Sequence, residues 1–160
     1  MLKRGDNHYN GAIVLGLNDA IVESSGALVG LTFALEKSSL IATAGLITGI
    51  AAALSMASSE YLSAKEDNKK NPLKASFYTG IAYLLAVLVL VTPYFLLEST
   101  YIAGGIMFSL VILIIAVYTK HDSKICKESF GKKFAEMLGI SLSISVISFV
   151  VGILVRKLVA

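Results

Sequence analysis

Charged residues are scarce in this chain. They make up 16% of its 160 residues, whereas 56% of the residues are hydrophobic. The mean hydropathy is +0.76. Average soluble domains contain about 25% charged residues. The composition therefore argues against a soluble globular domain and indicates an integral membrane protein.

Cysteine and proline are also nearly absent. Because Cys126 is the one cysteine, an intrachain disulfide and a cysteine metal cluster within one chain are excluded. One of the two prolines, Pro93, lies near the end of an apolar segment. It predicts that a helix bends or ends there, since proline cannot donate the backbone hydrogen bond. The polar connections are too short to hold a soluble domain.

Five apolar segments are long enough to cross a membrane, for which a helix needs about 20 residues. They cover residues 11–35, 40–64, 75–97, 101–119 and 134–155. The first fits a signal peptide poorly, because an apolar leader would not tolerate Asp19 and Glu23. We expect an all-α membrane protein with five transmembrane helices, in which residues 1–160 form a single transmembrane domain. We expect an integral, multi-pass membrane protein, which in a prokaryote would lie in the cell membrane.

Lysine and arginine lie mainly on alternate connections of the expected helices. One side has 11 of the 14 basic residues and the other side has three. The 11 are Lys3, Arg4, Lys65, Lys69, Lys70, Lys74, Lys120, Lys124, Lys127, Lys132 and Lys133, and the three are Lys37, Arg156 and Lys157. The positive-inside rule then puts the N-terminus in the cytoplasm and the C-terminus outside. Topology explains the net charge of +3, and no nucleic-acid partner is expected.

Two carboxylates interrupt the first apolar segment, in the stretch GLNDAIVESSGALVG. At a rise of ~1.5 Å per residue from Gly11, Asp19 lies about 12 Å and Glu23 about 18 Å into the membrane. Intramembrane acids are expensive and functional by default. Spacings of three and four residues predict one helical face that comprises Gly16, Asp19, Glu23, Gly26 and Gly30. We expect this face to meet protein or a water-filled path.

The acid pair predicts a cation site coupled to protons. Two anions on adjacent turns repel each other, so at least one should hold a proton when the site is empty, whereas a bound cation favours two charged groups. Asn18, next to Asp19, is a further candidate ligand. The alternative is that the acidic and small-residue face only specifies helix association, in a membrane protein that transports nothing. An intramembrane enzyme is disfavoured, because no nucleophile motif is present.

The second apolar segment carries a complementary face. Gly45, Gly49, Ala52, Met56 and Glu60 share that face, with Thr48 beside it. Counted back from Ala64, Met56 is about 12 Å deep, level with Asp19, and Glu60 about 6 Å deep. A thioether beside carboxylates favours transition metals such as Fe²⁺ over Mg²⁺ or Ca²⁺. Met56 alone also fits core packing, and Glu60 also fits a position at the membrane interface.

Two motifs resemble the vacuolar iron transporter family. LGLNDAIV at 15–22 is similar to the family's L-G-x-x-D-G-x-V, and ALSMASSEY at 53–61 is similar to its A-x-S-M-x-x-x-E-Y. The resemblance implies a homodimer of five-helix chains with a path at the two-fold interface. It implies export of Fe²⁺, or Mn²⁺ in some relatives, from the cytoplasm in exchange for protons, with no prosthetic group. By motif, Asp19 would be the metal and proton carboxylate, Met56 the thioether and Glu60 the second-helix acid.

The chain departs from the family pattern at three places. Ala20 replaces the glycine that usually follows the first-helix aspartate, and Thr48 stands where some members have a glutamate. The glutamate-rich cytoplasmic domain of better known members is replaced by KEDNKKNPLK. The collection of metal on the inner side is therefore absent, supplied by another protein, or reduced to Glu66 and Asp67. Glu23 is unusual for the family. We predict that it takes over the role of the glutamate that some members have at the position of Thr48.

Two further places hold candidate ligands. Glu136 opens the fifth segment, where it would either gather cations or form a salt bridge with Lys132 or Lys133. His121, Asp122 and Cys126 lie together in the connection before that segment. They would either bind metal weakly or belong to an ordinary solvated loop on the positively charged side.

Overall fold

The computed structural model describes residues 7–68, 70–126 and 129–159. These residues form helices α1 (Asn7–Ala34), α2 (Ser38–Glu66), α3 (Pro72–Leu96), α4 (Thr100–Cys126) and α5 (Phe130–Val159). All five contain a stretch long and apolar enough to cross a membrane. The all-α fold with five membrane-spanning helices is therefore confirmed by length and composition.

Several helices are longer than the apolar segments from which they were predicted. α4 extends past the expected 101–119, and α5 past the expected 134–155. Hydropathy detects only the apolar part of a helix, whereas backbone hydrogen bonding continues through polar residues. α3 keeps Pro93 inside its last turn and ends at Leu96, so the proline lies close to the end that it was predicted to mark.

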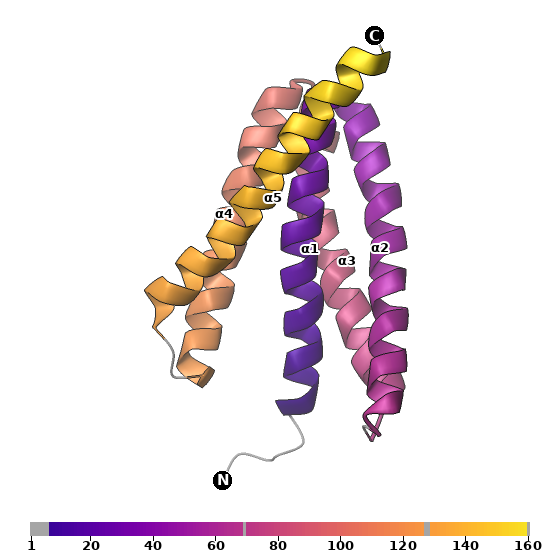
Figure 1. Cartoon of the computed structure of the whole chain (residues 1–160), viewed down its shortest axis with the longest axis vertical. Helices are drawn as coiled ribbons and strands as arrows, with labels where there is room; N and C mark the ends of the chain where they lie inside the picture. The colour runs from indigo at the N-terminus through magenta and orange to yellow at the C-terminus, as the bar shows by residue number, and fades with distance from the viewer. Residues whose placement is uncertain (1–6, 69, 127–128, 160) are drawn as a thin grey trace.

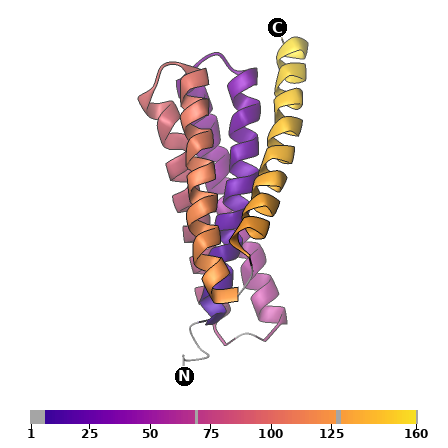
Figure 2. The same cartoon turned by 90° about the vertical axis from the view of Figure 1, so that its left-hand side faces the viewer.

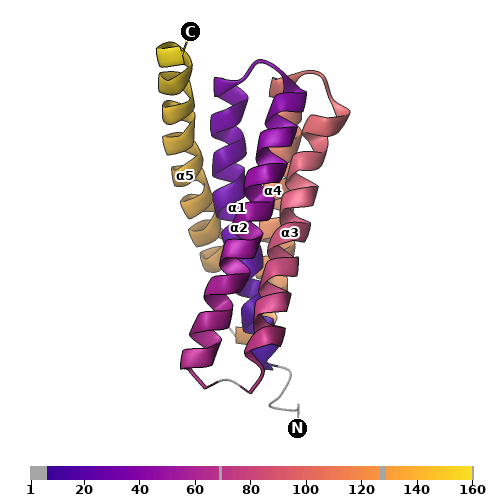
Figure 3. The ribbon, with the colours of Figure 1, turned by 90° about the vertical axis from the view of Figure 1, so that its right-hand side faces the viewer.

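The helices alternate in direction (Figure 1). The start of α1, the end of α2, the start of α3, the end of α4 and the start of α5 lie at one end, which we call the lysine-rich end, and the end of α5 lies at the other (Figures 1 and 2). α3 lies behind α1 and α2 in Figure 1, and Figure 3 shows α2 beside α3 along their length. α1 is the central helix, because it contacts each of the other four.

α5 crosses α1 obliquely rather than running parallel to it (Figure 1). Near its C-terminal end, Arg156 donates to the carboxylate of Glu36 in the α1–α2 connection at 2.8 Å. Both side chains are exposed, and exposed ion pairs contribute about 1 kcal/mol or less. The position of α5 therefore depends mainly on its packing against α1.

The core lies between α1, α2, α3 and α4. Its largest fully buried side chains are Ile21, Leu28, Ile41, Tyr83, Leu90, Tyr94, Met107 and Ile115. The Tyr94 hydroxyl lies 2.7 Å from the hydroxyl of Thr32, which also donates to the Leu28 carbonyl at 2.7 Å. These buried polar groups are thus hydrogen-bonded, as groups removed from water need to be.

Glycines bring the helix backbones close together. A methyl group at Gly16 would overlap the Thr79 carbonyl oxygen of α3, and one at Gly152 would overlap the Gly30 carbonyl oxygen of α1. A methyl group at Gly49 would overlap Val87. Between helices in lipid there is no hydrophobic driving force, so close packing contributes much of their association. The fold therefore depends on these small residues.

We expect Gly16→Ala to destabilise the protein by about 1–3 kcal/mol, because overpacking forces backbone shifts. Gly105→Ala is the matched control, since a methyl group there meets nothing within 4 Å. Unfolding of both variants in the same detergent micelles, followed by helical circular dichroism, checks this expectation. Equal stability of the two variants would contradict the assigned contact between α1 and α3.

Candidate functional site

The two acids of α1 lie on the outside of the single chain, inside the span Gly11–Ala34. Asp19 is half-buried and Glu23 is exposed. The carboxylate of Glu23 accepts a hydrogen bond of 2.8 Å from the Tyr83 hydroxyl of α3. Since Tyr83 is only 1% exposed, its ring is held by the core and its hydroxyl fixes the carboxylate.

Sequence reasoning missed Tyr83. A signal existed, because its phenol is a polar group in the middle of an apolar segment, and buried tyrosine hydroxyls usually find a partner. Nothing in the spacing of residues indicated that this partner would be Glu23. That pairing depends on how α3 packs against α1.

The expected face of acids and glycines is divided between neighbours. Gly16 faces α3, whereas Gly26 and Gly30 face α5, where a methyl group would approach the Ile144 side chain to 2.6 Å and the Ser148 carbonyl oxygen to 3.0 Å. α5 therefore covers the α1 face beyond the acids. The acids lie between these two contact regions, on a surface that remains accessible in one chain.

The candidates on α2 occupy different environments. Met56 is half-buried and packs against the core, whereas Glu60 is 7% exposed. Thr48 is exposed, and its hydroxyl donates to the Ala44 carbonyl at 2.8 Å. A methyl group at Gly45 would approach Leu28 of α1 to 2.7 Å. α2 thus meets α1 near Leu28, on the C-terminal side of the acids.

The remaining candidates lie elsewhere. Glu66 and Asp67 are exposed at the end of α2. Asn18 and Glu136, both exposed, line a pocket of about 380 Å³ between α1, α4 and α5. Glu136 of α5 and Asn18 of α1 therefore line the same pocket.

The candidate loop ligands belong in part to a helix. α4 includes the backbone of His121, Asp122 and Cys126. Their side chains lie outside the described part of the chain. Within the described part, no group of three or more His, Cys, Asp or Glu side chains is arranged to hold a metal ion.

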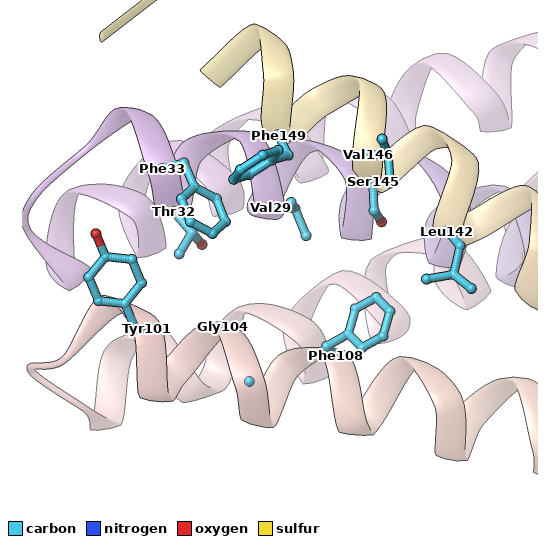
Figure 4. A pocket seen from close by; sticks show the side chains of 11 residues that line it. Val29, Thr32, Phe33, Tyr101, Gly104, Phe108, Leu142, Ser145, Val146 and Phe149 are labelled. Atoms are coloured by element: carbon cyan, nitrogen blue, oxygen red, sulfur yellow. The ribbon is translucent and has the colours of Figure 1, made fainter. Parts of the chain in front are cut away.

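A second cavity, of about 320 Å³, lies between α1, α4 and α5 near Tyr101 at the start of α4 (Figure 4). Phe33 contacts Phe149 edge-on, with ring centroids 4.5 Å apart, and Tyr101 at 5.9 Å. Ser145 is the most buried polar residue of the α5 wall. The lining contains no carboxylate, so its chemistry differs from that of the acid pair.

The fold and the acid pair define an integral multi-pass membrane protein with carboxylates in its first span. Residues 10–70 match the model of the VIT family. No curated protein matches the chain. The match covers less than half of the chain, mainly α1 and α2, and it confirms the resemblance to the vacuolar iron transporter family over these residues. It indicates a transporter of metal ions rather than an enzyme.

We expect Tyr83→Phe to weaken the binding of Mn²⁺ by about tenfold, because a hydrogen bond to a charged group is lost and the carboxylate is no longer fixed. Titration calorimetry of the purified protein measures this affinity. Tyr94→Phe is the matched control, since it removes another buried tyrosine hydroxyl from α3, paired with Thr32. If both variants lose the same affinity, the loss reflects a less stable protein rather than a change at the metal site.

Proposed function

We propose that the protein is a secondary transporter that moves divalent transition metal out of the cytoplasm in exchange for protons. Its candidate substrates are Fe²⁺ and Mn²⁺. The observation that carries the proposal is the Asp19 and Glu23 pair, one helical turn apart within a span, with Glu23 held by Tyr83. The family match over α1 and α2 supports metal as the cargo.

The exposure of Glu23 supports a path at a homodimer interface. A charged side chain near the centre of a bilayer costs about 2.5–3.5 kcal/mol or more, so a stable protein would cover this face or line it with water. A second copy related by two-fold symmetry would place the same face against itself. Two copies together would supply four carboxylates and two Met56 thioethers.

The carboxylates and the thioether have different roles in the proposed exchange of metal and protons. The carboxylates of Asp19 and Glu23 provide oxygen ligands, and the Met56 sulfur favours softer transition metals. When the metal is bound, its two charges offset the repulsion between the acids. When it leaves, that repulsion favours uptake of a proton by one of them. Metal and proton thus compete for the same carboxylates, which is the basis of an exchange.

The location of the lysines supports the membrane orientation. The start of α1 and the helix ends that the lysine-rich segments of the sequence join lie at one end of the bundle (Figure 1). By the positive-inside rule this end faces the cytoplasm. Glu60 lies closer to this end than Met56 does, so we assign Glu60 to the cytoplasmic part of the path.

We expect Asp19→Asn to lower Fe²⁺ and Mn²⁺ uptake into acid-loaded proteoliposomes by about tenfold or more, because a charged ligand and a proton carrier are lost together. Zn²⁺ and Ca²⁺ serve as competing substrates, and Glu98→Gln, an exposed acid outside the spans, is the control. If the rate of metal uptake changes neither with the pH gradient nor in Asp19→Asn, and the dimer persists, then the acids serve assembly and the transporter proposal is wrong.

Glu23→Gln tests whether this acid carries a proton. An amide cannot exchange a proton, so we expect slower uptake and a weaker dependence of the rate on the pH gradient than in the unmodified protein. Rates measured over a series of internal pH values at constant external pH give this dependence. An unchanged rate with an unchanged pH dependence would remove Glu23 from the mechanism.

A further inference from the structure

A polar pocket at the lysine-rich end has no role in the proposed transport. It occupies about 380 Å³ between α1, α4 and α5. Its polar lining consists of Asn18 from α1, Tyr118 from α4, and Lys133 and Glu136 from α5. Leu15 and Ile140 belong to its apolar lining. The pocket therefore combines both signs of charge with an apolar wall.

The pocket lies at the level of lipid headgroups. Gly11, which contributes to its lining, is the first residue of the α1 span. Tyr118 lies near the end of the span Thr100–Lys120, and Lys133 near the start of the span Phe130–Leu158. Lys133 and Tyr118 thus lie where the hydrocarbon core ends, whereas Leu15, Asn18 and Ile140 lie deeper, toward the acyl chains.

The charges of the pocket match a zwitterion. Lys133 and Glu136 are three residues apart on α5, so their side chains are neighbours on the helix surface. A lysine ammonium has three donors and can bind a phosphate while it keeps another partner. A carboxylate accepts strong hydrogen bonds from a primary ammonium. A headgroup with a phosphate and a primary amine satisfies both residues.

Other common headgroups match less well. The quaternary ammonium of phosphatidylcholine has no N–H to donate to Glu136. Phosphatidylglycerol has a phosphate for Lys133 but no cation for Glu136, so its negative charge would lie beside an unpaired carboxylate. Among the three, phosphatidylethanolamine alone offers both a phosphate to Lys133 and an N–H donor to Glu136.

We propose that the pocket lined by Lys133, Glu136, Asn18 and Tyr118 binds the headgroup of phosphatidylethanolamine, with the phosphate at Lys133 and the ammonium at Glu136. The acyl chains extend along Leu15 and Ile140. Because the pocket includes residues of α1, α4 and α5, a bound lipid links the start of α1 to the α4–α5 pair. This site is separate from the proposed exchange of metal and protons.

The test uses the full chain in vesicles with equal amounts of phosphatidylethanolamine, phosphatidylcholine and phosphatidylglycerol, followed by native mass spectrometry of retained lipid. We expect phosphatidylethanolamine to be enriched about tenfold over phosphatidylcholine, the difference that a charge-assisted hydrogen bond provides. Glu136→Gln should remove most of this preference, whereas Lys133→Gln should lower the retention of all three lipids, because each of them carries the phosphate. Lys132→Gln, which removes a neighbouring exposed charge outside the pocket lining, should change neither the preference nor the retention.

A second series of measurements uses the unmodified protein and varies the lipid headgroup. Stepwise N-methylation of the phosphatidylethanolamine headgroup removes one N–H at a time, and retention by the unmodified protein should fall with each step. Equal retention of the three lipids, stronger retention of phosphatidylglycerol, a preference that survives Glu136→Gln, or lipid retention that Lys133→Gln leaves unchanged would overturn the proposal. Soluble phosphoethanolamine that binds as tightly as the lipid would assign the site to a free metabolite and would overturn it as well.

Discussion

The close approach of α1 to its neighbours is the constraint on which the rest of the structure depends. Gly16 lets α1 contact the α3 backbone, and Gly30 with Gly152 lets it contact the α5 backbone. Lipid provides no hydrophobic drive between helices, so these contacts must come from close packing. Because α1 is anchored on two sides, its acids occupy the surface between the two contacts. Larger residues at these glycines would move the acids as well as the helix.

Polar groups inside the spans follow two different rules. Thr32 and Tyr94 pair with each other within the core, and Thr79 donates to the Ala12 carbonyl at 3.0 Å, which joins α3 to α1. Glu23 also has a partner in Tyr83, yet its carboxylate stays exposed in one chain. The pairs within the core stabilise the fold of one chain. An exposed intramembrane acid also requires a partner outside the chain, either a second copy or water. This difference separates structural polar groups from functional ones.

Much of the fold was predictable from local features of the sequence. Length and hydropathy located all five helices, since each membrane span must satisfy its backbone hydrogen bonds within itself. The acid pair was also visible, because a carboxylate inside an apolar segment stands out. The helix ends were less visible, as α4 shows by continuing to Cys126. A helix continues through polar residues that a hydropathy pattern excludes.

The sequence by itself determined the five spans, the depth of Asp19 and Glu23, and the lysine-rich end, because these depend on the order and polarity of residues along one helix. Only the tertiary structure decided that Tyr83 donates to Glu23, that the glycines of α1 serve two different neighbours, and that Asn18 shares a pocket with Glu136. Helical spacing assigns a residue to a face, but the neighbour on that face depends on the packing and crossing of separate helices. The chemistry of the site therefore depends on interhelical contacts that no single segment specifies.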